Sequence, residues 1–199
     1  MENPFSVPRK SAWGARISIA GVREADRMGG LNTLSSRSAP FFRSGAGRVR
    51  RAVRGDLDAL MALEAVCFPA HRRADRRSLR RALAADSQEV WVVSGPGGGV
   101  QGAMVLFVYA HALRVYSVAV LPAARGGGAG GRLLALARAL ARRRGKKRIT
   151  LEADAVDEKL LGWYAVRGFR VMETLRDYYA PGEDAVRMCL TLSPSPRRC

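Results

Sequence analysis

The sequence predicts an α/β fold of the α+β kind, in which helices cover the faces of a mixed β-sheet. A β-branched and aromatic run over residues 115–120 is followed by a glycine-rich turn and by a leucine- and alanine-rich run over residues 133–141, the pattern of strand, loop and helix. Two apolar runs flank the glycines of residues 95–99, and two more flank residues 181–184, as the strands of hairpins do. Because a strand–helix–strand connection makes parallel neighbours, the sheet is expected to be mixed.

Regular patterning starts near residue 48, and its first half reads as one strand, two helices and three strands. The first helix has Gly55 and Asp56 as its N-cap and stops near Phe68 and Pro69, and the second helix is very basic. The expected strands cover residues 49–53, 90–94, 100–110 and 113–120. The first helix begins at residue 57, and the second covers residues 78–85.

The second half adds a strand, a helix and a final antiparallel pair. In the strand over residues 148–153, alternation places Leu151 on one face of the sheet and Glu152 on the other. This strand is expected beside residues 115–120, with the glycines at the carboxyl ends of both. The remaining elements are a helix over residues 158–167 that stops at Gly168, and strands over residues 169–179 and 185–192. The predicted order is β-α-α-β-β-β-α-β-α-β-β.

The patterned region divides the chain into one domain and two flanking segments. With 199 residues, 48% of them hydrophobic, the chain can bury a sizeable core in a single domain, which we expect over residues 48–192. Residues 1–47 are rich in Arg, Ser, Gly and Pro and poor in acids, which fits a disordered basic extension, a transit peptide, or sequence upstream of a true start at Met28. Residues 193–199 read as a short tail.

The charge of the chain points to polyanionic partners. A net charge of +17 and a pI near 11.2 make coenzyme phosphates, ribosomal RNA and acidic peptides candidates. The alternative is compositional, with the arginines as the solvated surface of a chain rich in Arg, Ala and Gly. No apolar run reaches the length of a membrane span, and the cysteines and histidines lack the spacing of a disulfide framework or a metal site. We expect a cytoplasmic protein with neither a metal nor a membrane partner.

The glycine-rich turn of residues 125–131 has the features of an anion-binding loop. A helix N-terminus presents unpaired N–H groups and the positive end of the helix dipole, and glycines expose the backbone there. The nucleoside triphosphate loop needs Lys and then Ser or Thr after its last glycine, but Arg132 and Leu133 follow Gly131. Residues 126–131 also match the dinucleotide-binding motif G-x-G-x-x-G, yet too little chain follows for the remaining strands of a dinucleotide-binding domain. A strand before the turn and a helix after it disfavour a flexible linker.

A third pattern, V-x-P-x-x-R-G-x-G-x-G, fits the same turn. It is matched by Val120, Pro122, Arg125, Gly126, Gly128 and Gly130. This pattern resembles the acetyl-coenzyme A signature of the GCN5-related N-acetyltransferases (GNATs), in which the loop holds the pyrophosphate of the cofactor. The expected order of elements is also similar to the GNAT acyl-CoA N-acyltransferase fold, and the resemblance covers about residues 48–192.

The C-terminal motifs resemble those of the RimI-type N-terminal alanine acetyltransferases of ribosomal protein. Their pattern is L-E-V-R, an Asn, L-Y-x-x-x-G-F, R-x-Y-Y and G-E-D-A-x-x-M-x-L. The corresponding segments of this chain are L-E-A starting at Leu151, W-Y at Trp163, G-F at Gly168 and R-D-Y-Y at Arg176. The last motif is matched by G-E-D-A starting at Gly182, followed by Met188 and Leu190. It departs where Asp157 replaces the Asn, where Ala153 and Asp154 replace Val-Arg, and at Gly127, where many relatives have a basic or long side chain.

The resemblance implies acetyl transfer from acetyl-CoA to a primary amine, with Glu152 as general base and Tyr164 as general acid. It implies a cofactor site formed by Val118, Ala119, Val120, Arg125, Gly126, Gly127, Gly128, Ala129, Gly130, Gly131 and Asp157. The expected acceptor is a protein N-terminal amine, such as that of a ribosomal protein, which would enter beside Tyr178, Tyr179 and residues 67–72. A lysine or a small amine is the alternative acceptor.

Residue chemistry leaves an alternative for each catalytic candidate. Attack of an amine on a thioester requires that the amine lose a proton, that the carbonyl oxygen be stabilised and that the thiolate gain a proton. Glu152 suits the first task, directly or through a water, or else pairs with one of the many arginines. Tyr164 suits the last task, or else is a half-buried core residue. A backbone N–H of residues 118–120 would hold the oxygen. From another class of function, a non-catalytic basic protein that binds RNA or ribosomes is the alternative.

Overall fold

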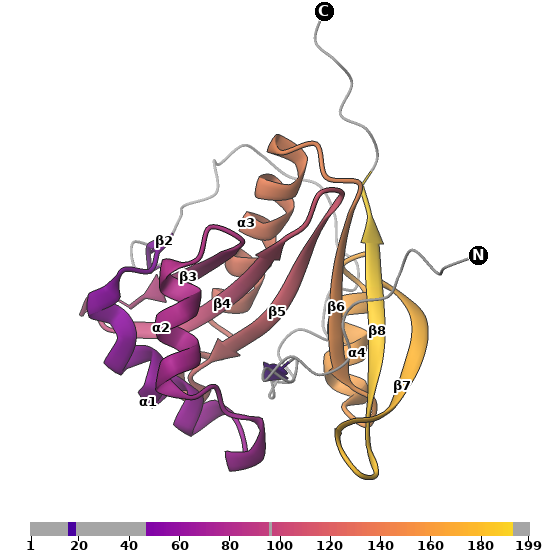
Figure 1. The fold of residues 1–199 in the computed structure, drawn as a ribbon, viewed down its shortest axis with the longest axis horizontal. Coiled ribbons are helices and arrows are strands. Elements are labelled where there is room, and N and C mark those ends of the chain that lie inside the picture. Colours follow the sequence, from indigo (N-terminus) through magenta and orange to yellow (C-terminus); the bar gives the residue numbers. More distant parts are fainter. Residues whose placement is uncertain (1–15, 19–46, 96, 193–199) are drawn as a thin grey trace, which may run out of the picture.

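A central sheet with helices on both faces forms the molecule (Figure 1). The computed structural model describes residues 16–18, 47–95 and 97–192. Its strands are β1 Arg16–Ser18, β2 Val49–Arg51, β3 Gln88–Ser94, β4 Val100–Val108, β5 Ala112–Val120, β6 Arg148–Asp154, β7 Arg170–Ala180 and β8 Glu183–Thr191. Its helices are α1 Leu57–Cys67, α2 Arg76–Ala84, α3 Ala129–Arg143 and α4 Glu158–Ala165, with short 3-10 turns η2 Arg54–Asp56, η3 Ala70–Arg72 and η4 Pro122–Ala124. None of these helices is long and apolar enough to cross a membrane.

The sheet has the strand order β2-β3-β4-β5-β6-β8-β7 and is mixed, as predicted. Antiparallel pairs join β2 to β3, β3 to β4, β4 to β5, β6 to β8 and β7 to β8. The one parallel pair on this path is β5 with β6, because α3 carries the chain over the sheet between them. The order of elements between residues 48 and 192 is the predicted one.

Two hydrophobic cores lie on opposite faces of the sheet. Leu60 of α1 and Leu79 of α2 pack on one face against β3, β4 and β5. Leu133 of α3 and Leu160 of α4 pack on the other face against β5, β6 and β8. Strand β5 is buried along its whole length, since both cores enclose it. The end of β5 is therefore held rigidly by packing on both sides.

Helix α1 begins at Leu57 as predicted, but its capping and the start of α2 differ from the sequence prediction. Asp56 precedes α1, but its carboxylate does not cap that helix, because Val53 N–H and the Arg50 guanidinium donate to it at 2.7 Å. Helix α2 begins two residues earlier than predicted, since the Asp75 carboxylate accepts the N–H of Ser78 at 2.6 Å and caps it. A competing cation and an overlooked capping residue account for the two differences.

Strand β1 was not predicted. Residues 16–18 pair in parallel with residues 117–119 of β5. Strand β4 occupies the other edge of β5, so β1 takes the edge that β6 has left. Apart from these three residues and Gly47, the predicted extension over residues 1–47 lies outside the described residues, as does the tail over residues 193–199.

Candidate active site

The two parallel strands β5 and β6 separate halfway along β5. They pair between Ala112–Val115 and Arg148–Leu151, and the pairing ends there (Figure 1). The backbone of residues 116–120 beyond this point faces the opening, with Val118, Ala119 and Val120 each buried. In this structure residues 117–119 pair with β1. The predicted parallel pairing of these strands is confirmed, and its early end places the backbone of residues 116–120 at the opening.

The glycine loop, residues 125–131, connects the end of β5 to α3. Gly126 and Gly128 have φ values of 79° and 78°, the left-handed region that side chains rarely adopt. The first hydrogen bond of α3 runs from Arg132 N–H to the Gly128 carbonyl at 3.0 Å. The N–H groups of residues 129–131 therefore precede any acceptor within the helix. Gly131 has ordinary backbone angles and open space where a Cβ would lie, so its lack of a side chain leaves room for a ligand.

Two hydrogen bonds to one backbone carbonyl fix the start of this loop at the end of β5. The Val120 carbonyl accepts a hydrogen bond from Arg125 Nε at 3.0 Å and another from Cys67 Sγ at 3.5 Å. Burial raises the pKa of the Cys67 thiol. A protonated thiol and a guanidinium thus hold the carbonyl from two sides, and the loop backbone is positioned before any ligand arrives.

Glu152 lies in a buried ion cluster on the sheet face that carries α1 and α2. Its side chain is 1% exposed and accepts from Arg114 Nε at 2.9 Å and from Arg187 Nε at 2.9 Å. Arg114 also donates to the Tyr178 hydroxyl at 2.8 Å. Burial lowers the pKa of Arg114, but the charge of Glu152, the hydrogen bond to it and the nearby Tyr178 together outweigh burial, so the pKa is raised. Arg114 Nη2 also contacts the Glu152 carboxylate, at 2.8 Å. The arginine pairing considered for Glu152 is therefore present, and one of about four lone-pair positions of its carboxylate remains.

Tyr164 projects from α4 into the core beside β7. Its side chain is fully buried, and its hydroxyl has no hydrogen-bond partner among the described residues. The ring makes edge contacts with Trp163 and Phe169 at centroid distances of 4.9 and 5.4 Å. Burial raises its pKa, and nearby Tyr179 adds to the rise, so the hydroxyl stays protonated at neutral pH. An unpartnered buried donor is costly, and it suits a ligand atom that accepts its hydrogen bond.

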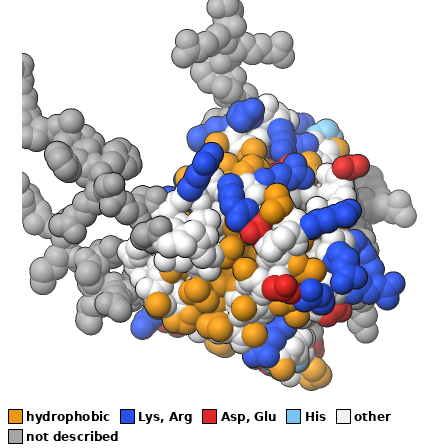
Figure 2. All heavy atoms as spheres, turned by 90° about the vertical axis from the view of Figure 1, so that its left-hand side faces the viewer, with side chains coloured by type: hydrophobic (Ala, Val, Ile, Leu, Met, Phe, Trp, Pro, Cys, Tyr) orange, Lys and Arg blue, Asp and Glu red, His pale blue; other side chains and the backbone are white. Residues whose placement is uncertain are grey.

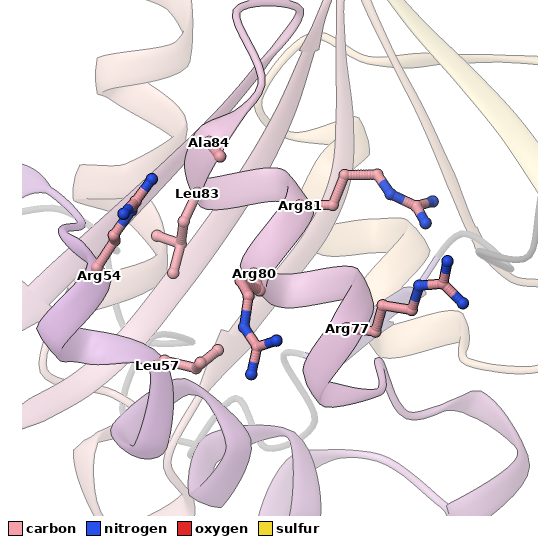
Figure 3. Close-up of a pocket in the computed structure, with 7 residues that line it drawn as sticks. All are labelled: Arg54, Leu57, Arg77, Arg80, Arg81, Leu83 and Ala84. Carbon is pink, nitrogen blue, oxygen red and sulfur yellow. The ribbon is translucent and has the colours of Figure 1, made fainter.

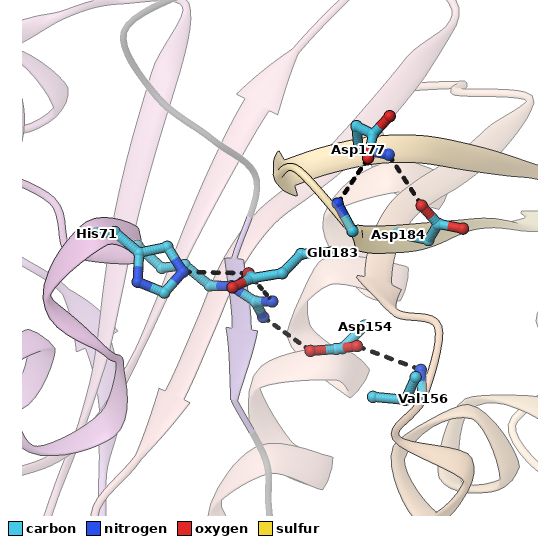
Figure 4. A network of polar contacts seen from close by, with 8 residues as sticks. His71, Asp154, Val156, Asp177, Glu183 and Asp184 are labelled. Carbon is cyan, nitrogen blue, oxygen red and sulfur yellow. Dashed lines mark hydrogen bonds and ion pairs between the residues drawn. The ribbon is translucent and has the colours of Figure 1, made fainter.

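A second polar network crosses the opening between the two halves of the sheet (Figure 4). Arg72, in the turn η3 between α1 and α2, donates to Asp154 at the end of β6 at 2.8 Å and from its Nε to Glu183 of β8 at 2.8 Å. His71 also contacts Glu183, at 3.1 Å. The Arg72 guanidinium lies over the Tyr179 ring, 3.9 Å from its centroid. The side expected for the acceptor therefore carries two carboxylates, held by an arginine.

A break in the β7–β8 register brings two tyrosines to this side. Pairing is interrupted between Leu175 and Ala180, where Asp177 adopts a φ of 51°. Asp177 accepts from Gly182 N–H at 2.6 Å, which closes the hairpin. Burial raises the pKa of Tyr179, and Tyr178 adds to the rise, so the Tyr179 hydroxyl remains protonated at neutral pH.

The structure brings most of the predicted site residues to the opening, and it shows partners that sequence reasoning missed. The glycine loop, the end of β5 and Glu152 lie at the carboxyl ends of β5 and β6. Asp157, predicted to contact the cofactor, caps α4 by accepting Leu160 N–H at 2.9 Å. Arg114 was not anticipated, and Arg72 was anticipated only as the last of residues 67–72 on the acceptor side. A cation within the apolar run of residues 112–120 was the available signal for Arg114, because a buried charge requires a partner.

The comparisons with known proteins agree with this architecture. The model of the acetyltransferase (GNAT) family matches residues 57–169, more than half of the chain. The chain therefore belongs to the GNAT family and is an acetyl-CoA-dependent N-acetyltransferase. This membership favours an enzyme over the non-catalytic RNA-binding alternative. No curated protein matches the chain.

Three solved structures share the fold. The ribosomal-protein-S18-alanine N-acetyltransferase of Escherichia coli aligns with a TM-score of 0.67 at 20% identity, over 77% of this chain and 98% of that one. The GphF GNAT-like decarboxylase in complex with isobutyryl-CoA gives 0.65 at 24%, over 73% and 100%. The ribosomal-protein-alanine N-acetyltransferase of Brucella melitensis gives 0.63 at 25%, over 73% and 99%. The solved structures thus include both an isobutyryl-CoA complex and N-acetyltransferases of ribosomal protein alanine.

Proposed function

We propose that the protein transfers the acetyl group of acetyl-CoA to the α-amine at the N-terminus of a protein, with a ribosomal protein as the expected substrate. The observation that carries the proposal is the opening between β5 and β6, which has an anion-binding helix terminus on one side and two carboxylates on the other. The first suits coenzyme phosphates, and the second suits an amine that arrives as a cation. Two structurally similar proteins are N-acetyltransferases of ribosomal protein alanine.

The glycine loop has the properties that a coenzyme pyrophosphate requires. The N–H groups of residues 129–131 precede the first helical acceptor, and the positive end of the α3 dipole lies there. The space in front of Gly131 and the unpartnered hydroxyl of Tyr164 fit a ligand that extends from the loop into the core. Acetyl-CoA would supply an acetyl thioester, whose acetyl group passes to the amine and whose sulfur leaves as a thiolate. Backbone N–H groups of residues 118–120 would stabilise the carbonyl oxygen.

Tyr164 is the proposed proton donor to the departing sulfur. Burial keeps its hydroxyl protonated, and among the described residues no group competes for its hydrogen. A thiolate in the same buried environment is itself a stronger base than one in water, so transfer from tyrosine becomes feasible. General acid catalysis of this kind contributes about 10²- to 10⁴-fold to the rate.

Glu152 is the proposed base, acting through a water. Its two oxygens accept hydrogen bonds from Arg114 and Arg187, and the remaining lone pair can accept a proton from a bridging water. The arginines fix the carboxylate in one orientation, as a positioned base requires. Loss of the Glu152 charge would remove the buried anion that Arg114 and Arg187 share and leave them only Tyr178 and Glu173 as partners. Breaking a buried ion pair costs about 3–5 kcal/mol in folded proteins.

The carboxylates of Asp154 and Glu183 are the proposed receptor for the acceptor ammonium group. Both are held by Arg72, so an incoming cation competes with that guanidinium for them. These two carboxylates favour an acceptor whose amine has no acidic group next to it. The terminal amine of alanine, the lysine side chain and small amines all meet this condition. A lysine or small-molecule acceptor therefore remains the alternative.

Peptides that differ only in the free amine separate these acceptors. One peptide has N-terminal alanine and no lysine, and its partner has an acetylated N-terminus and one internal lysine. The proposal predicts that the first gains one acetyl group, seen as a mass increase together with release of coenzyme thiol. Acetylation of only the lysine peptide would contradict the N-terminal assignment while leaving the enzyme class in place.

Substitution of Glu152 tests the base. Glu152→Gln keeps the shape of the side chain, and we expect a fall in kcat of at least about 100-fold in enzyme that remains folded. The control is Arg187→Gln, which breaks the same ion cluster and keeps the carboxylate. Equal losses of kcat in the two variants would make Glu152 a structural residue rather than a base.

A further inference from the structure

A hollow lined by arginines lies on the outer side of α1 and α2, away from the candidate active site (Figure 3). Its volume is about 610 Å³, which is large enough for a nucleotide-sized group. Four exposed arginines from η2 and α2 surround it, and three apolar side chains form the rest of its lining. These residues are Arg54, Arg77, Arg80, Arg81, Leu57, Leu83 and Ala84. We refer to this set as the arginine pocket.

The four guanidinium groups of the arginine pocket are not neutralised by the protein. None of them makes a hydrogen bond or an ion pair with a described residue, whereas nearby acids already have partners. Asp56 is bound by Arg50, and Asp58 by Arg76 at 2.6 Å. The Asp75 carboxylate, which caps α2, is close enough for Arg77 and Arg81 to contribute to its lowered pKa, after its bonds to Ser78. The pocket therefore keeps a large excess of positive charge.

Helix α2 carries this charge at a cost to its own stability. Its sequence RRSLRRALA places arginines at positions 76 and 80 and at positions 77 and 81, and each pair is one helical turn apart. Like charges at this spacing destabilise a helix. In Figure 3, Arg77 and Arg81 extend side by side from α2, while Arg80 points toward Leu57 of α1. An external anion between these groups would relieve the repulsion.

The lining distinguishes between two anionic macromolecules. The side chains that line the pocket offer hydrogen-bond donors but no acceptor, so a peptide lying on Leu57, Leu83 and Ala84 would leave its backbone N–H groups without partners there. The faces of a ribose and a base have no backbone N–H group that needs an acceptor. In addition, one guanidinium group can donate two parallel hydrogen bonds to two phosphate oxygens. Among the side chains that line the pocket there is no aromatic ring on which a base would stack, so phosphate contacts would dominate.

The position of the arginine pocket connects it to the acceptor side of the active site. The turn η3, which carries Arg72, leads directly into α2, and α2 is about 14 Å long at 1.5 Å per residue. Figure 2 views the side of the molecule that carries β2, α1 and α2 and shows Lys and Arg side chains outnumbering acidic ones on it. A polyanion bound here would lie about one short helix away from the residues proposed to receive the amine.

We propose that the arginine pocket binds the phosphate backbone of RNA and so brings a ribosome-associated acceptor to the active site. The choice of RNA rests on the proposed ribosomal-protein substrate, whereas the binding of a polyphosphate rests on the pocket alone. Contacts to four arginines and none to base edges imply little dependence on RNA sequence and a strong dependence on salt.

The test is the binding of a fluorescently labelled RNA hairpin to the full-length protein, measured by anisotropy between 50 and 200 mM salt. Arg77→Gln/Arg81→Gln is compared with Arg142→Gln/Arg143→Gln, which removes the same charge from the exposed last turn of α3. We expect the first variant to weaken RNA binding at least about fivefold and to lower the salt slope by about 1.4, and the control to change Kd less than about twofold. Arg77→Lys/Arg81→Lys is expected to restore part of the affinity.

Three results would overturn the proposal: no RNA binding, equal losses in the two arginine variants, or displacement of the RNA by a polyglutamate peptide at matched charge. Equal losses of RNA affinity would mean that binding depends on the net charge of the protein rather than on this pocket. The stabilisation of each variant by acetyl-CoA is measured in parallel, because it reports folding and the coenzyme site separately. Failure of the coenzyme site would remove that stabilisation and leave RNA binding intact.

Discussion

The glycine loop and the arginine pocket are both suited to phosphate, but they use different physical means. The glycine loop offers backbone N–H groups at the start of α3, held by the end of β5, and it contains one charged side chain, Arg125. The arginine pocket offers four exposed guanidinium groups on long side chains. Backbone N–H groups in fixed positions select a ligand of one shape. Guanidinium groups on flexible side chains can bind ligands of many shapes, and salt screens their charge. The difference indicates a selective coenzyme site and a permissive docking site.

Removal of the Tyr164 hydroxyl separates the chemistry from both binding surfaces. Tyr164→Phe is expected to lower kcat by about 10²- to 10⁴-fold, because the departing sulfur loses its proton donor. The free energy of unfolding should stay equal or increase, since a buried hydroxyl without a partner is removed. Coenzyme and RNA affinities should not change. An unaltered kcat would show that Tyr164 is a core residue and nothing more.

Salt sharpens the comparison between the two surfaces. Raising the salt concentration from 50 to 200 mM should weaken RNA binding about 50- to 150-fold if four phosphates are contacted. Coenzyme binding to the glycine loop should change less than about fivefold, because neutral N–H groups provide most of the contacts. Titration calorimetry for the coenzyme and anisotropy for the RNA give both values. Parallel slopes for the two ligands would mean that one electrostatic surface serves both.

Substitution of a left-handed glycine tests the rigidity of the loop. Gly128→Val forces a β-branched side chain into a φ of 78°, which costs on the order of 1–3 kcal/mol and reshapes the helix start. Coenzyme affinity is expected to fall about tenfold to a hundredfold. Gly145→Val is the matched control, because Gly145 has a φ of 61° at the far end of α3. If the two variants weaken coenzyme binding equally, the loop has no special role.

Strand β1 provides the smallest expected effect. It pairs with residues 117–119, whose backbone N–H groups are part of the proposed coenzyme site, so the proposal implies that β1 and the coenzyme exclude one another. Ile17→Pro removes one N–H from β1, and a lost hydrogen bond of about 1 kcal/mol would tighten coenzyme binding about fivefold. Ile17→Val keeps the strand and serves as control. Equal affinities in the two variants would show that β1 does not compete.

The fold was largely predictable from the sequence because its signals are local. The alternation of residues 148–153, the glycines after β5 and the turn at residues 181–184 each report a neighbour in the chain, and the structure has these elements in the predicted order. The predicted start of α2 was two residues late, although Asp75 stands where a capping residue is expected.

The candidate site was predictable only in part, because its partners are distant in the sequence. Glu152 meets Arg114 and Arg187, and Arg72 reaches Asp154 and Glu183 across more than 80 residues of chain. No periodicity encodes such pairs, and many arginines compete for the role. The pocket formed by η2 and α2 also depends on how two helices pack, which residue spacing does not specify.

The stability of the protein with and without acetyl-CoA tests the central claim, that the glycine loop holds the coenzyme. At one hundred times its dissociation constant, the coenzyme should increase the free energy of unfolding by about 2.7 kcal/mol. Thermal unfolding of the full-length protein measures this change as a rise in Tm. We predict a clear rise for the wild type and for Gly145→Val, and a smaller one for Gly128→Val at the same coenzyme concentration. A folded wild-type protein with an unchanged Tm would contradict the account.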